Sequence, residues 1–62
     1  MITTRRAALI ERKDALAASL RADVEAMPNE VDRKGFSQAV ELGNLLADIL
    51  IDIAHPVTDA PS

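Results

Sequence analysis

Catalysis and metal binding usually depend on histidine, cysteine, aspartate and glutamate side chains. This chain contains one histidine, ten acidic residues and no cysteine. Without cysteine there is no disulfide framework and no thiolate metal site, and a single histidine argues against a metal centre. The acids Glu41, Asp48 and Asp52 recur at helical spacing and are expected to form a solvated helix face. Carboxylates do acid–base work only in a cleft that shifts their pKa values. We therefore predict no catalytic residue, no cofactor, no metal and no enzymatic activity.

The charged residues of this chain are distributed unevenly along the sequence. All seven basic residues lie in positions 1–34, which also hold six acids, whereas positions 35–62 hold four acids and no Lys or Arg. The two parts therefore carry charges of +1 and −4, which sum to the net −3 of the chain. A net charge of −3 gives little support for a basic nucleic-acid-binding surface. Phe36 is the one aromatic residue of the sequence, which argues against binding single-stranded nucleic acid by base stacking. We expect the partner to be a protein.

Two cations, Arg6 and Lys13, interrupt the apolar line of the first half of the chain. In one interpretation their stems extend along apolar surface and their charged heads reach water. Pairing within the hairpin is an equally simple alternative, because an antiparallel hairpin brings Arg5 and Arg6 near Asp48, Asp52 or Asp59. In the other interpretation Arg6 and Lys13 belong to a docking surface, because cations in a first helical turn oppose the helix dipole. Ile51 borders the same region. The predicted partner-binding residues are Arg5, Arg6, Ile10, Arg12, Lys13 and Leu50.

A second candidate site lies where Arg33 and Lys34 precede Phe36. Phe36 either packs beneath a turn, which we favour, or is exposed as a binding anchor, a role typical of aromatic residues. His55 is interpreted as a residue that interacts favourably with the dipole at a helix C-terminus. Arg21 and Glu25 are spaced for an ion pair within one helix.

Two helices, at about residues 4–26 and 30–54, are predicted to position all of these side chains. The first segment is rich in good helix formers, and the residue before Pro28 is disfavoured in a helix. Thr3 or Thr4 is expected to cap the first helix and Asn29 the second.

The start of the second helix has a competing position at Ser37, since Gly35 costs about 1 kcal/mol within a helix. We favour the start near residue 30, which makes the two helices nearly equal in length. Residues 1–54 then form a helical hairpin, and residues 55–62 form a flexible C-terminal tail.

The predicted fold is an all-α antiparallel helical hairpin that dimerises into a four-helix bundle. The small residues Ala15, Ala18, Ala22 and Ala26 are expected to face Gly35, Ala39, Gly43 and Ala47 within the hairpin. Burial in a lone hairpin falls short of the roughly 1.5 kcal/mol per residue that ordering costs, and a homodimer supplies the missing core. The predicted dimer core is Leu9, Leu16, Leu20, Val24, Leu42, Leu46, Ile49 and Ile53.

The arrangement of two amphipathic helices within residues 4–54 resembles that of two kinds of small bacterial, plasmid or phage protein. One is the Rop-type RNA-binding hairpin, a dimer of two-helix chains; the other is the helical anti-activator or inhibitor with which phages disable a host regulator. The resemblance rests on the helical pattern about Pro28-Asn29. It carries over no functional residue. The acidic second half counts against the RNA-binding version.

We predict a small dimeric regulator or inhibitor that binds a host or regulatory protein directly, for example a transcription factor. The alternatives are a Rop-like nucleic-acid-binding dimer and a structural or assembly subunit. Asp48 and Asp52 interrupt the apolar runs, so none reaches the roughly 20 residues of a membrane span. Charged residues also follow Arg5 and Arg6, where a targeting signal would need an apolar region. A soluble cytoplasmic protein is therefore expected.

Overall fold

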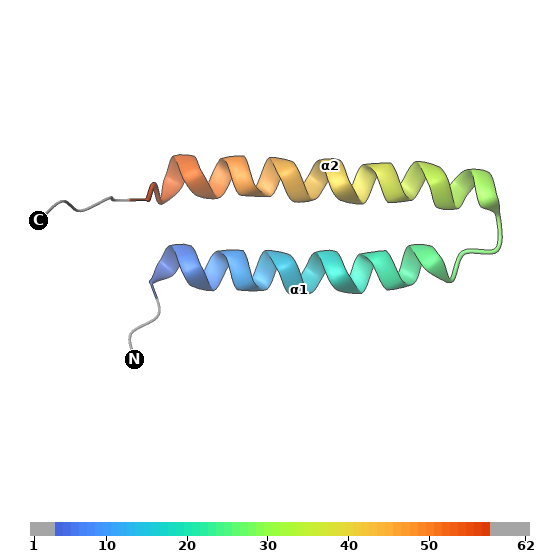
Figure 1. Ribbon diagram of the computed structural model, residues 1–62, viewed down its shortest axis with the longest axis horizontal. Helices are drawn as coiled ribbons and strands as arrows, with labels where there is room; N and C mark the ends of the chain where they lie inside the picture. Colours follow the sequence, from blue (N-terminus) through green and yellow to red (C-terminus); the bar gives the residue numbers. More distant parts are fainter. Residues whose placement is uncertain (1–3, 58–62) are drawn as a thin grey trace, which may run out of the picture.

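The structure, a computed structural model, describes residues 4–57 and contains two antiparallel helices, α1 (Arg5–Glu25) and α2 (Glu30–Ala54). They lie side by side and are joined by one short turn, so that the start of α1 and the end of α2 lie at the same end of the hairpin (Figure 1). We call this end the open end. The predicted all-α hairpin is confirmed. Its first helix is one residue shorter at each end than expected.

The helix boundaries follow from the capping residues. The hydroxyl of Thr4 accepts a hydrogen bond from the backbone N–H of Ala7 at 3.0 Å. The side chain of Asn29 accepts one from the N–H of Asp32, also at 3.0 Å. Both satisfy an N–H group that has no partner within the helix. The start of α2 near residue 30 is confirmed, and the alternative at Ser37 is wrong.

The turn is closed by a side chain as well as by the backbone. The guanidinium of Arg33 donates to the carbonyl of Met27 at 2.9 Å, so α2 is tied to the end of α1. Gly35 lies within α2, and a Cβ added there would meet nothing within 4 Å. Helix capping and this contact therefore outweigh the helix cost of one glycine.

The contact between the helices is a narrow seam. Of the described residues, the buried ones are Ala17, Val24 and Ile51, each 5–9 % exposed. Half-buried residues continue the line at intervals of three and four, the spacing that places side chains on one helix face. We define the seam as Arg6, Ile10, Lys13, Ala17 and Val24 of α1 with Val40, Asn44, Ala47, Asp48 and Ile51 of α2.

The expected packing of the small residues against each other is wrong. Of the four alanines predicted to line the hairpin, three lie on α1 and Ala26 caps its end, and all four are exposed. On α2 only Ala47 of the matching set is half-buried. A Cβ at Gly43 would meet nothing within 4 Å, so no backbone approaches it. The physical reason is area: facing alanines and glycines remove little apolar surface from water, whereas Val24 and Ile51 remove more.

Three ion pairs cross between the helices and fix their alignment. Arg6 lies 2.6 Å from Asp52, and Lys13 lies 2.7 Å from Asp48. Arg21 and Glu41 form a bidentate pair with distances of 2.7 and 2.8 Å. The predicted pair of Arg21 with Glu25 is wrong, because the flat guanidinium instead binds both carboxylate oxygens across the hairpin.

Candidate protein-binding surface

The hairpin exposes many large apolar side chains. Most of them are between 40 and 72 % exposed and belong to α2 at helical spacing. We define the apolar face as Leu16 and Leu20 of α1 with Phe36, Leu42, Leu46, Ile49, Leu50 and Ile53 of α2. Large exposed apolar surfaces are typical of interaction sites on proteins.

A shallow groove runs through the apolar face where the two helices meet. It encloses about 330 Å³ and is lined on one side by Leu16 and Leu20, and on the other by Phe36, Ala39 and Gly43. Phe36 is 53 % exposed. The interpretation that it packs beneath the turn is therefore wrong, and it belongs to the rim of the groove.

The predicted dimer-core residues divide between two places. Six of the eight, among them Leu42 and Ile53, belong to the apolar face. Leu9 is half-buried, and Val24 is buried in the seam between the helices. Val24 thus already has its partners within one hairpin.

The predicted partner-binding residues also divide. Arg6 pairs with Asp52 and donates to the backbone carbonyl of His55 at 2.9 Å, so it ties the start of α1 to the end of α2 at the open end. Lys13 contacts Asp14 as well as Asp48, and its side chain is only 14 % exposed. Ile10 of the predicted set is half-buried and is held by packing. Ile51, which borders the set, is buried.

Arg5, Arg12 and Leu50 of that set remain exposed. Within residues 4–57, neither arginine forms an ion pair. Both border a hollow of about 290 Å³ on α1, together with Leu9. Since Leu9 lies midway between them at helical spacing, the three side chains form one basic and apolar edge near the open end.

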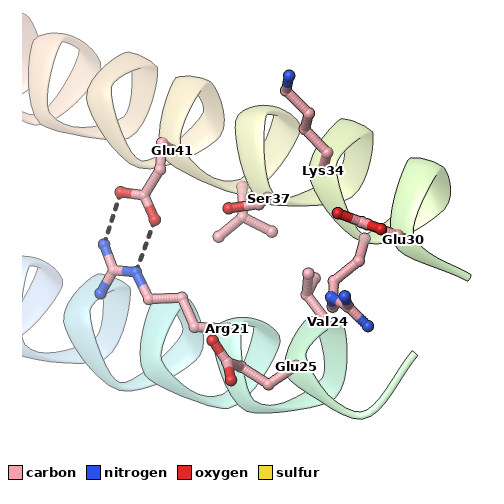
Figure 2. Close-up of a pocket in the computed structure, with 9 residues that line it drawn as sticks. Arg21, Val24, Glu25, Glu30, Lys34, Ser37 and Glu41 are labelled. Atoms are coloured by element: carbon pink, nitrogen blue, oxygen red, sulfur yellow. Dashed lines mark hydrogen bonds and ion pairs between the residues drawn. The ribbon is translucent and has the colours of Figure 1, made fainter. Parts of the chain in front are cut away.

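The region beside the turn is charged, and it contains a hollow of about 470 Å³ (Figure 2). The fork of Arg21 points at the carboxylate of Glu41. The other charged residues of the lining are Glu25, Glu30, Arg33 and Lys34. Arg33, which belongs to the second candidate site, also donates to the turn carbonyl of Met27. His55 follows α2 as its capping residue, and its N–H donates to Ile51 at 2.7 Å.

No family model, curated protein or solved structure matches this chain. The described helices include none that is both long and apolar enough to span a bilayer. In residues 4–57, no three His, Asp or Glu side chains come together as metal ligands would. The apolar face and the edge formed by Arg5, Leu9 and Arg12 are therefore the features from which we argue a function.

The pair of Arg21 and Glu41 makes hairpin stability depend on pH. Hydrogen bonds from Arg21 hold the pKa of Glu41 below its ordinary value of about 4.5. A carboxyl group with a lowered pKa stabilises the fold above its unfolded-state pKa, and this stabilisation is lost as the pH falls through the folded-state pKa. Below pH about 4.5 we therefore expect the melting temperature to fall.

Replacing Glu41 with glutamine should flatten this acid dependence, because glutamine does not titrate. Thermal melts followed by circular dichroism between pH 3 and 7 measure the effect. The control is Glu25→Gln, since Glu25 forms no ion pair among the described residues and should leave the pH profile unchanged. An equally steep acid dependence in Glu41→Gln would show that other groups cause it.

Proposed function

We propose that the protein is a homodimeric regulator or inhibitor that binds another protein directly. The observation that supports this proposal is the apolar face, whose eight large side chains are 40–72 % exposed. Fully burying one such side chain stabilises a protein or complex by about 1.5–3 kcal/mol. Joining two copies through this face would make a four-helix bundle with a shared core.

The sparse interior of the hairpin supports the same proposal. Of the described residues only Ala17, Val24 and Ile51 are buried, and one of these is an alanine. Chains of this size bury a small fraction of their surface and often need an oligomer to be stable. A stable interface removes about 800 Å² from each partner, and the apolar face offers its largest side chains for that purpose.

The edge near the open end supplies the proposed contact for the regulated protein. Arg5 and Arg12 are exposed on either side of Leu9, and arginine is enriched at binding hot spots. Arg5 begins α1, where a cation opposes the helix dipole, so stability does not account for it. We propose that the partner is a protein with an acidic surface, and we place the interaction in the cytoplasm.

Nucleic acid is less favoured as the partner. Arg6, Lys13 and Arg21 are neutralised by acids across the hairpin, so three of the seven basic residues are already occupied. The exposed cations near the open end are few, whereas nucleic-acid affinity grows with the number of phosphates neutralised. No catalytic role is proposed for any residue.

The test is capture of the regulated protein by two variants of equal charge. Arg5→Gln with Arg12→Gln removes two positive charges from the edge, and Lys34→Glu makes the same net change in the charged hollow. A tagged pull-down from the native host with mass spectrometry identifies the captured proteins. Purified candidates are then titrated against each variant.

We expect the double variant to lose at least tenfold in affinity, while Lys34→Glu binds like the original chain and both keep the dimer mass. Each arginine lost from a hot spot costs more than about 1 kcal/mol, which supports this size of effect. Equal affinity of the two variants would contradict the proposed edge. A Lys34→Glu variant that alone loses the partner would place the contact in the charged hollow.

A further inference from the structure

We infer that the second copy packs head-to-tail on the apolar face, with the open end of one hairpin beside the turn of the other. This inference rests on the proposed homodimer and specifies its geometry. It is argued from the position of the apolar face along the hairpin and from the charges at its edge.

The apolar face is centred in a way that suits a two-fold axis. On α2 it extends from Phe36 to Ile53, and Leu46 lies close to its middle. On α1, Leu16 and Leu20 line the central groove. A two-fold axis perpendicular to the helices near Leu46 would therefore place the apolar face of one copy against the apolar face of the other. An isologous interface between identical chains requires this arrangement.

The groove near this axis leaves room for the second copy. Ala39 and Gly43 form its low side, and a Cβ at Gly43 would meet nothing within 4 Å. Leucine side chains of a second hairpin are wide enough to fill such a depression. Because Gly43 lies three residues before Leu46, the depression coincides with the middle of the apolar face.

The charges along the edge of α1 distinguish head-to-tail from parallel packing. Arg12 follows Arg5 by seven residues and Asp23 follows Arg12 by eleven, which are close to two and three helical turns. These three residues therefore share one side of the helix with Leu9 and Leu16. All three charged residues are exposed. The edge is therefore positive towards the open end and negative towards the turn, where Asp32 of α2 is also exposed.

Head-to-tail packing brings the positive part of one edge towards the negative part of the other. Parallel packing gathers four arginines at one end of the bundle and four acids at the other. Exposed pairs contribute only about 0–1 kcal/mol each, so they select the orientation and do not hold the dimer together.

Single cysteine variants test the orientation directly, because the chain has no cysteine of its own. Leu46→Cys places a thiol near the proposed axis, and Phe36→Cys and Ile53→Cys place thiols near the two ends of the face. Each variant, and a mixture of the last two, is treated with a short bis-maleimide and separated on a denaturing gel. Sedimentation and circular dichroism establish that each variant keeps its mass and helix content.

Head-to-tail packing predicts a covalent dimer for Leu46→Cys, none for Phe36→Cys alone, and a covalent dimer for the mixture of Phe36→Cys with Ile53→Cys. Equal self-linking of Phe36→Cys and Leu46→Cys would overturn the inference in favour of parallel packing. A dimer mass with no cross-link at any of these positions would also overturn it, since the copies would then meet elsewhere. A monomeric mass of the unaltered chain would refute the homodimer itself.

Discussion

Replacing Leu46 with glutamate is expected to dissociate the proposed dimer. Leu46 is 56 % exposed in the single hairpin and lies in the middle of the apolar face. A symmetric dimer loses the burial of two leucines, about 3–6 kcal/mol together, and each copy must also desolvate a carboxylate. The dissociation constant should therefore rise by roughly 100- to 10,000-fold. Sedimentation equilibrium over a range of concentrations measures it.

The matched control for this variant is Ser37→Glu. Ser37 lines the charged hollow, so the same added charge falls outside the apolar face (Figure 2). We expect its dimer mass to be unchanged. If Leu46→Glu sediments as the original chain does, the apolar face is not the dimer interface. If both variants dissociate, net charge and not the lost leucine governs association.

Replacing Ile51 with alanine is expected to have the largest effect on the stability of the hairpin itself. Ile51 is 9 % exposed and is one of the few buried contacts between α1 and α2. Truncating a buried isoleucine to alanine costs about 2–5 kcal/mol. In a chain of this size that corresponds to a melting temperature lower by roughly 10–30 °C. Thermal melts followed by circular dichroism at several concentrations measure the change.

Val31→Ala is the control, because Val31 also lies on α2 but is 79 % exposed. Substitutions at such positions usually change stability by less than about 0.5 kcal/mol. A melting temperature of Ile51→Ala within a few degrees of the Val31→Ala value would contradict the seam as the stabilising contact of the hairpin.

The helices and their ends were determined by local sequence. Each helix is a run of good helix formers that begins after a capping residue, Thr4 for α1 and Asn29 for α2, and Pro28 separates the two. These features predicted the ends of both helices to within one residue. These interactions join residues three or four positions apart, so they can be evaluated without knowing the fold. The amphipathic pattern of α2 also predicted most of the apolar face, including Leu42 and Leu46.

Only the tertiary structure decided which faces of the helices meet. Spacing alone made the alanine and glycine residues suitable for close packing, but the seam is formed by Val24, Ile51 and their neighbours. The same choice places Arg6 and Lys13 opposite acids and leaves Arg5 and Arg12 exposed. Helical periodicity shows which face of a single helix is most apolar. How two helices pack depends on the apolar area that a pair of faces buries together and on the ion pairs that form between them.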